Sequence, residues 1–337
     1  MQSLDWFVLI FTLLFIVIYG TIKTTGAKTA NAYLKAGNDA KWWTIGLSVM
    51  ATQASAITFL STPGQAYNDG LGFVQFYFGL PIAIVIICMI FIPIYHKLKV
   101  YTAYEYLESR FDLKTRSLTA VLFLVQRSLS AGITIFAPSI ILSTVLGWDL
   151  LTLNIIIGSL VIIYTVSGGT KAVNYTQKYQ MAVILVGLVI VLFTTLSLLQ
   201  ENINFSNAIK IASVNSKMEG LYFSFDLENR YTVWSGILGG TFLMMSYFGT
   251  DQSQVQRYLS GKSLKEMQLG MIFNGVFKIP MQFFILFIGV MVFVFYQFNP
   301  SPINFNPQGE EVIYNTVYQN EYIGLKESLE DNFKEKT

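Results

Sequence analysis

The chain has 337 residues, of which 53% are hydrophobic and 12% are charged, and its formal net charge is +2. Soluble domains carry about 25% charged residues, so this composition excludes an ordinary soluble protein. Several stretches without ionisable side chains are long enough to cross ~30 Å of hydrocarbon. We therefore expect an all-α polytopic membrane protein that contacts the lipid bilayer and has no nucleic-acid partner.

The hydropathy pattern predicts eight membrane-spanning helices. In chain order they cover residues 4–22, 43–61, 72–95, 117–146, 150–167, 178–199, 232–250 and 267–298. The first span begins with Asp5 and no basic residue, which is the reverse of a cleavable signal peptide. The spans 117–146 and 267–298 would each reach ~45 Å as straight helices. They must therefore tilt, kink or protrude, and Pro138 and Pro280 are candidate kink points.

The basic residues of the loops indicate a topology. Lys and Arg collect in the loops 23–41, 97–116, 168–177 and 251–266, whereas 62–71 and 147–149 have neither. The loop at 201–231 has three basic residues balanced by four acidic ones. Because cytoplasmic loops are enriched in Lys and Arg, we expect the plasma (inner) membrane with the N-terminus outside. The tail at 299–337 then also lies outside, and we interpret its polar last twenty residues as an external loop segment.

The second span contains an unusual stretch, "MATQASAITFLSTPG" (Met50–Gly64), in which small and polar residues replace the usual large apolar ones. One interpretation is close helix packing, with hydroxyls bonded inside the helix. The other is a discontinuous helix whose free carbonyls coordinate a cation near the bilayer midplane. The segment Ser61-Thr62-Pro63-Gly64 predicts a helix end on the outer side, and it does not decide between the two.

Two basic residues lie deep inside predicted spans. Lys278, in "MIFNGVFKIPMQ", is ~17 Å along the last span. A lysine at the centre of a span costs ~2.5–3.5 kcal/mol or more, so it is a candidate functional residue. The alternative is that it snorkels along a helix extending into the cytoplasm. Arg127 has a similar depth, but its neighbours Gln126 and Ser128 favour a polar stretch on the cytoplasmic side.

Other reactive residue types give no sign of an enzyme. Cys88 is the single cysteine, so an intrachain disulfide is impossible and no metal site is indicated. The single histidine, His96, follows an apolar run and has no Ser or Cys partner, so we interpret it as an interfacial residue. The "GGTK" at Gly168–Lys171 lacks the spaced glycines of a phosphate-binding loop. We expect no catalytic residues and no organic cofactor.

Four strings occur in a characteristic order: "ASAITFLSTPGQAY", "KVYTAYEYLESRFDLKTRSLTA", "YTVSGGTKAVNYTQKYQM" and "YFGTDQSQVQRYLSGKS". Together they resemble the sodium/solute symporter family, from the first span to at least residue 298. The strings "TAYEYLESRF" and "APSIILSTVLGW" further resemble the branch that holds the iodide, monocarboxylate and multivitamin carriers.

The resemblance implies a LeuT-type inverted-repeat fold, here incomplete with about eight transmembrane helices. It assigns 1–22 to an extra leading helix, 43–199 to the first five-helix repeat, 200–231 to an external loop, 232–298 to the first two helices of the second repeat and 299–337 to an external loop or tail. Since the family's fold needs further helices, we expect the N-terminal part of a transporter. The missing C-terminal helices are then absent or supplied as a separate chain.

The resemblance also implies where ligands bind. In this family the span matching 42–61 is broken, and its backbone carbonyls help to bind the coupling sodium ion. By motif register these carbonyls belong to Ala51 and Ala54. The positions expected to face the solute are Gln53, Thr58, Tyr77, Tyr247, Phe248 and Lys278, with Tyr247 at the position of an inner gate in the sugar carriers.

Departures from the family pattern limit the class of solute that the chain is expected to bind. Tyr77 occupies a position where sugar carriers have an acidic residue, and Met244 lies near the position of an amide residue in those carriers. Both replacements remove hydrogen bonds that a sugar would need, so they argue against a polyol as the solute. Gln177 replaces a family Asp that is associated with a sodium exit path or with a second sodium, so one sodium ion per cycle is favoured. Lys278 favours an anionic solute such as a carboxylate.

These expectations amount to sodium-coupled symport of a small solute by alternating access, with Na⁺ as the coupling ion. The alternatives are a membrane sensor or input module with the same fold, or a fragment that does not transport.

Overall fold

The computed structural model describes residues 3–24, 29–199, 203–226, 228–304 and 307–336. Across these ranges every regular element is a helix, and an isolated β-bridge joins Ala40 to Gly261. The expectation of an all-α protein is therefore confirmed. The long helices are α1 (Ser3–Thr24), α8 (Leu113–Leu146), α9 (Leu150–Ser197) and α13 (Leu264–Phe298).

Shorter helices connect or extend the long ones. They are α2 (Ala30–Lys35), α3 (Trp42–Gln53), α4 (Ala56–Asp69), α5 (Leu80–Ile86), α6 (Ile92–Leu98), α7 (Ala103–Arg110), α10 (Phe205–Val214), α11 (Gly240–Gly249), α12 (Gln252–Leu259), α14 (Pro307–Tyr314) and α15 (Gln319–Lys336). Two 3₁₀ segments, η1 (Ala36–Asn38) and η2 (Gly70–Tyr77), and two π segments, η3 (Ile87–Phe91) and η4 (Ser235–Gly239), lie between them.

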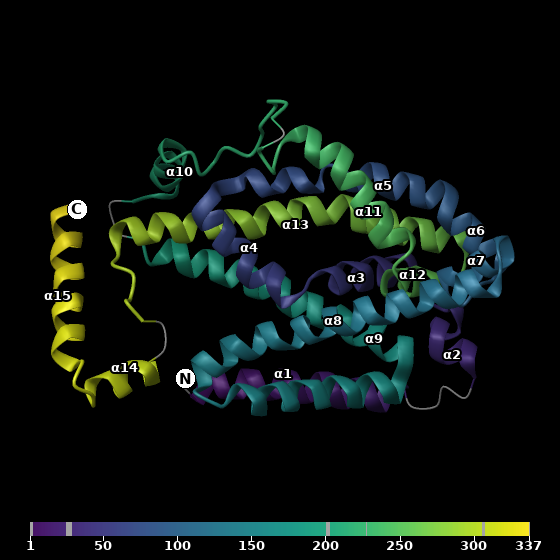
Figure 1. The fold of residues 1–337 in the computed structure, drawn as a ribbon, viewed down its shortest axis with the longest axis horizontal. Helices are drawn as coiled ribbons and strands as arrows, with labels where there is room; N and C mark the ends of the chain where they lie inside the picture. Colours follow the sequence, from purple (N-terminus) through teal and green to yellow (C-terminus); the bar gives the residue numbers. More distant parts are fainter. Residues whose placement is uncertain (1–2, 25–28, 200–202, 227, 305–306, 337) are drawn as a thin grey trace.

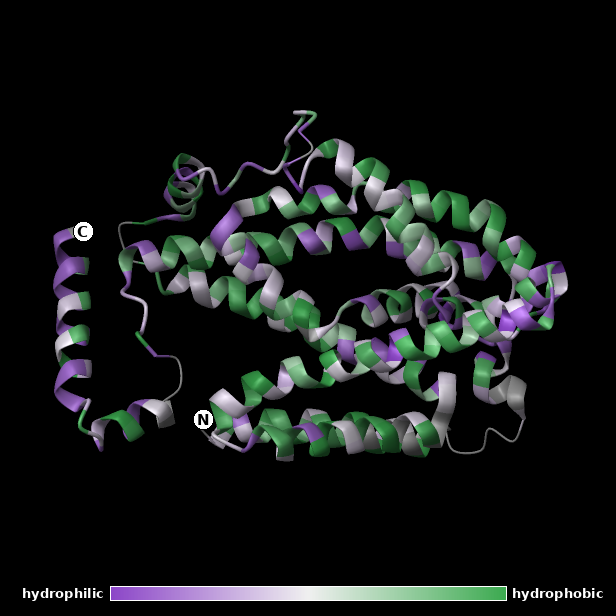
Figure 2. Ribbon diagram, in the orientation of Figure 1, coloured by the Kyte–Doolittle hydropathy of each residue, from purple (hydrophilic) through white to green (hydrophobic). Residues whose placement is uncertain are grey.

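The long helices lie along the long axis of the molecule, with α1 at one edge (Figure 1). The N-terminus lies at the same end as α10 and α15, whereas α2, α6 and α7 lie at the opposite end. Hydrophobic residues cover the long helices and hydrophilic residues dominate α15 (Figure 2). This distribution is that of an integral membrane protein.

Within the described residues, five segments are long and apolar enough to cross a membrane: Ser3–Gly20, Ile57–Leu98, Leu113–Leu146, Gly169–Ser197 and Leu264–Phe298. The sequence predicts eight spans, and the difference arises where predicted spans are split or joined. The first, fourth and last predicted spans correspond to α1, α8 and α13. Both α8 and α13 continue through their prolines, Pro138 and Pro280.

The second predicted span consists of two helices, α3 and α4, so it is discontinuous. The predicted helix end at Ser61–Gly64 is wrong, because α4 continues through Pro63 to Asp69. A packed neighbouring helix allows a proline inside a membrane helix. Here α13 supplies that neighbour, since a Cβ added to Gly289 would lie 2.1 Å from the Pro63 carbonyl oxygen.

The third predicted span, 72–95, changes helix type along its length, from η2 through α5 and η3 to α6. Its first part packs backbone to backbone against η4 and α11. A Cβ added to Gly79 would lie 2.1 Å from the Thr241 nitrogen, and one added to Gly236 would lie 2.0 Å from the Gln75 oxygen. Small residues permit this close approach of membrane helices.

The fifth and sixth predicted spans form one continuous helical run, α9, with a sharp turn at Gly169. This residue has φ 55° and ψ −151°, a backbone conformation that glycine adopts without a steric cost. The loop predicted at 168–177 is therefore wrong, because the chain is helical again directly after the turn.

The polar tail is also more regular than predicted. The sequence predicts a loop segment in the last twenty residues, but Gln319–Lys336 among them form the helix α15. Glu, Lys and Leu are strong helix formers, and a segment rich in them can be helical without an apolar face. The loop before the seventh predicted span likewise contains α10, which Asn204 caps by accepting a hydrogen bond from the Asn207 N–H at 2.9 Å.

Candidate functional site

The discontinuity between α3 and α4 lies at Ala54 and Ser55. Ala54 has φ −86° and ψ 79°, and its N–H bonds back to the carbonyls of Met50 at 2.9 Å and Ala51 at 3.2 Å. Ser55 has an extended backbone, and its side chain makes no capping hydrogen bond. The last carbonyls of a helix have no helical donor. The break therefore turns carbonyl oxygens, including those of Ala51 and Ala54, away from regular helical bonding.

One buried face of α13 carries an unusual set of polar side chains. Asn274, Lys278 and Gln282 are spaced by four residues, so they lie above one another on this face. All three are completely buried. The amide atoms of Asn274 and Gln282 and the Lys278 ammonium have no hydrogen-bond partner among the residues that the structure describes. Buried polar groups are almost always hydrogen-bonded. This face, which we call the α13 polar face, is therefore suited to a polar ligand.

The Lys278 ammonium has an aromatic neighbour but no acid. Its Nζ lies 5.8 Å from the centre of the Tyr77 ring, within the range of a cation–π interaction. Tyr77 is buried and packs edge-on against Phe73 and Phe76. No carboxylate in the described ranges forms an ion pair with Lys278. The structure therefore leaves the buried Lys278 amine without an acidic partner among the described residues.

Gln53 and Thr58 flank the break in the second span. The Gln53 Oε1 atom is buried without a partner in the described chain, and its Nε2 lies 4.0 Å from the Met244 sulfur on α11. The Thr58 hydroxyl lies 3.5 Å from the Gln53 carbonyl, at the limit of a hydrogen bond. Gln53 thus connects the break to the helix that carries the next two predicted site residues.

Tyr247 and Phe248 lie in different surroundings. Phe248 is completely buried in a core cluster that also contains Tyr77 and Met244. Tyr247 is half-buried, and its hydroxyl accepts a hydrogen bond of 2.7 Å from Gln254 on α12. The structure therefore places Gln53 beside Met244 and Lys278 beside Tyr77, with Tyr77, Met244 and Phe248 in one core cluster, and it places Tyr247 toward α12.

Arg127 is part of this α12 neighbourhood and does not reach the α13 polar face. Its guanidinium pairs with Asp251 and also hydrogen-bonds to Ser253, at the start of α12. Arg127 thus lies beside the start of α12.

A buried network that the sequence did not single out joins α3 to α9. The Ser48 hydroxyl lies 2.8 Å from Asn174 Oδ1 and 2.5 Å from Gln177 Oε1. The Gln177 amide donates to the Thr52 hydroxyl at 2.9 Å, and Asn174 donates to Ser260 at 3.1 Å. Gln177, noted for replacing a family Asp, is thus engaged in holding helices together.

Asn274 and Gln282 were also missed as site residues. The string that contains Lys278 carries both, four residues to each side, so helical periodicity could have placed them on its face. Their lack of partners could not be read from the string. No group of three His, Cys, Asp or Glu residues in the described part of the chain is arranged to hold a metal ion.

Comparisons with known proteins agree on a family. The model of the sodium:solute symporter family matches residues 33–325. Human sodium-coupled monocarboxylate transporter 1 is 34% identical over 259 residues, covering 77% of this chain and 42% of that protein. The human sodium/iodide cotransporter is 31% identical, with 80% and 42% covered. The sodium-dependent multivitamin transporter of Oryctolagus cuniculus is 32% identical, with 84% and 44% covered.

The structure has a similar solved relative. A Na⁺-coupled sialic acid symporter, solved in a substrate-bound outward-open state, superposes with a TM-score of 0.80 and 28% identity. The match covers 90% of this chain and 65% of that one. The chain thus shares this transporter's helical fold and spans less than half the length of the curated relatives that it matches.

Proposed function

The chain belongs to the sodium:solute symporter family, and from this membership we propose that it takes part in sodium-coupled symport of a small anionic solute by alternating access. The observation that carries the proposal is the α13 polar face, where a buried ammonium has no acidic partner. Breaking a charge pair inside a protein is strongly destabilising, so an unpaired buried charge calls for an ion of opposite sign. A solute carboxylate is the anion that we propose.

The surroundings of Lys278 favour a short carboxylate over a sugar. Asn274 and Gln282 lie ~6 Å along the helix to either side, and their amides can both donate to and accept from a carboxylate and its substituents. The Tyr77 ring beside Lys278 belongs to an apolar core cluster. A polyol would leave most of its hydroxyls without partners there.

The broken second span is the proposed sodium site. Carbonyl oxygens suit a hard cation such as Na⁺, and we assign Ala51 and Ala54 as donors. The Ala51 oxygen already accepts one backbone hydrogen bond, and a carbonyl has a second lone pair for the ion. Because Gln177 is held by Ser48 and Thr52, we propose one sodium ion per cycle. Na⁺ bound at the break would hold Gln53 and Thr58 in position for the solute.

We propose the topology and repeat assignment on the same basis. The N-terminus and α15 lie at one end of the molecule, and α2 and α6 lie at the opposite end, where lysines are frequent (Figure 1). This separation supports an outside N-terminus with the basic loops in the cytoplasm. Residues 43–199 would form the first repeat and 232–298 the first two helices of the second.

The test is sodium-driven uptake into sealed vesicles made from the native membrane. Labelled propionate is offered with an inward sodium gradient or with potassium in its place, and propionamide serves as the neutral control. We expect propionate uptake that depends on sodium and is absent for the amide. Equal uptake with sodium and potassium would disprove the coupling. Equal uptake of propionate and propionamide would disprove the role of the anion.

A further inference from the structure

A polar cavity lies at the end of the molecule formed by α2, α6 and the α12–α13 connection, away from the α13 polar face. It has a volume of about 320 Å³ and is lined by Lys35, Asn38, Tyr95, His96, Lys99, Val100, Tyr101, Leu259, Gly261, Lys262 and Met267. Small-ligand sites begin at about 300 Å³. Met267 is ~17 Å along α13 from Lys278, so this cavity is separate from the proposed solute site.

The charge of the cavity is strongly one-sided. Lys35, Lys99 and Lys262 contribute three ammonium groups from three separate segments of the chain, and His96 adds an imidazole. None of the lining residues is an Asp or a Glu. The lysines therefore produce a positive potential that the cavity itself does not neutralise.

The walls of the cavity are held by hydrogen bonds between distant segments. The Asn38 amide donates to the Leu259 carbonyl at 2.9 Å. The backbone of Ala40 bonds to Ser260 and to Lys262, each at 3.1 Å, which forms the β-bridge to Gly261. The cationic side chains are therefore carried on a pre-formed frame, which lowers the cost of binding a ligand.

Lys35 forms the inner wall. It is 8% exposed, its Nζ donates to the Lys99 carbonyl at 2.8 Å, and it lies 4.4 Å from the centre of the Tyr101 ring. Burial lowers the pKa of Lys35, and nearby Glu105 opposes this shift. An ammonium has three donors, so Lys35 can donate to an anion and keep its hydrogen bond to the Lys99 carbonyl.

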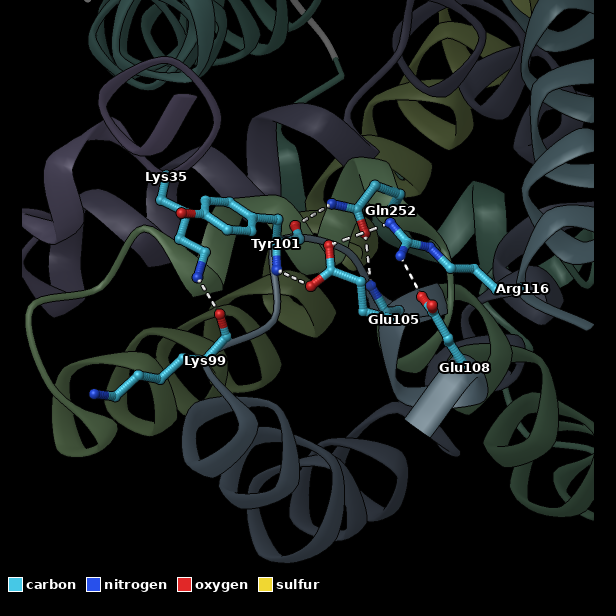
Figure 3. Close-up of polar contacts among 8 residues, drawn as sticks. Lys35, Lys99, Tyr101, Glu105, Glu108, Arg116 and Gln252 are labelled. Carbon is cyan, nitrogen blue, oxygen red and sulfur yellow. Dashed lines mark hydrogen bonds and ion pairs between the residues drawn. The ribbon is translucent and has the colours of Figure 1, made fainter. Parts of the chain in front are cut away.

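The carboxylates nearest to the cavity already interact with other groups. Glu105 accepts from the Tyr101 N–H at 3.0 Å and lies 3.7 Å from Arg116, which also pairs with Glu108. Figure 3 shows this acidic group on the far side of Tyr101 from Lys35 and Lys99. The ring thus separates the lysines of the cavity from the carboxylates, which are already engaged by Arg116.

We propose that this cavity, the α2–α6–α12 cavity, binds a phosphate-bearing anion of the size of a phospholipid headgroup. Basic pockets between membrane helices on the cytoplasmic side suit anionic headgroups. The cavity lies where α6 ends and α13 begins, at the ends of two segments apolar enough to cross a membrane. A bound phosphate would bridge three segments and stabilise their present arrangement. The same chemistry would accept a soluble phosphate, so the experiment separates the two sources.

The purified full chain in a neutral detergent is titrated by calorimetry with short-chain phosphatidylglycerol, short-chain phosphatidylcholine and inorganic phosphate. The test variant is K99Q/K262Q, and the matched control is K97Q/K265Q. All four lysines are exposed, and Lys97 and Lys265 lie next to the test positions in sequence but outside the lining. The two variants lose the same charge, so diffuse attraction falls equally in both.

We expect saturable binding of phosphatidylglycerol that K99Q/K262Q weakens at least about tenfold, since each surface lysine contributes about 1 kcal/mol to binding an anionic lipid. The control should bind as the native chain does, and K99R/K262R should restore binding, which excludes a folding defect. Tight binding of phosphatidylglycerol alone identifies a lipid, and equal binding of inorganic phosphate identifies a soluble anion. The proposal is overturned if neither anion binds, if phosphatidylcholine binds equally well, or if both double variants lose the same affinity.

Discussion

Lys35 and Lys278 are both buried lysines, yet their side chains have different partners. Lys35 is bonded to the Lys99 carbonyl and lies 4.4 Å from an aromatic ring centre. Lys278 has no acceptor in the described residues, and its nearest ring centre is 5.8 Å away. The fold therefore supplies an acceptor to Lys35 and none, among the described residues, to Lys278. The two lysines differ in their partners, although both are buried.

The largest expected effect is that of Lys278→Met. The substitution removes the charge that we assign to the solute anion, so the KM for solute should rise at least about 30-fold, corresponding to about 2 kcal/mol. The KM for sodium should change much less. Sodium-driven uptake in vesicles measures both constants.

Thermal unfolding of the same variant sharpens the comparison. An apolar side chain of similar length removes an unpaired buried charge, so Lys278→Met should be as stable as the native protein or more stable. A clear loss of stability, or an equal rise in both KM values, would make Lys278 a structural residue like Lys35.

Lys35→Met should have the opposite outcome. It leaves the Lys99 carbonyl without its donor, which costs about 1–3 kcal/mol of unfolding free energy, while the solute KM stays unchanged. Denaturant unfolding measures the loss, with the exposed Lys97→Met as the control. An unaltered stability would contradict the view that Lys35 supports the fold.

Asn274→Leu tests whether the whole α13 polar face serves the solute. Losing one amide should raise the solute KM about fivefold to tenfold, since a hydrogen bond contributes about 1 kcal/mol. Gln268→Leu is the matched control on the same helix, because Gln268 donates to the Cys88 carbonyl at 2.9 Å. That variant should lose stability and keep its KM. The reverse pattern would remove Asn274 from the site.

The smallest effect is expected for Thr58→Ala. The Thr58 hydroxyl makes one long contact of 3.5 Å, so it remains available to the solute. Its loss should raise the solute KM about threefold, corresponding to less than 1 kcal/mol. Solute-dependent uptake at several concentrations provides the measurement. Unchanged transport would show that the register assigned to the second span is wrong.

The sequence predicted the helical class, and it drew attention to the second span and to Lys278, which the structure shows to be discontinuous and buried, respectively. Small and polar residues in "MATQASAITFLSTPG" left close packing and a break as alternatives, and the family resemblance implied the break that the structure has at Ala54. The depth of Lys278 drew attention to the helix α13. These features are local, because they depend on residue types within one span.

The features that escaped prediction depend on contacts between distant segments. Asn274 and Gln282 became notable only when three-dimensional neighbours showed that nothing bonds to them. The continuation of α4 past Pro63 depends on Gly289, which is 226 positions away in the chain. Neither relation is visible in local composition or periodicity.

The glycine contacts have a mechanical consequence. Gly79 touches the backbone at Thr241, and Gly289 touches the backbone at Pro63, with no side chain between them to yield. Gly270 likewise allows α13 to pack closely against α3, since a Cβ added to Gly270 would lie 2.6 Å from the Ile45 side chain. Both halves of the broken span, α4 and α3, are therefore packed against α13 too closely for a larger side chain to fit between them.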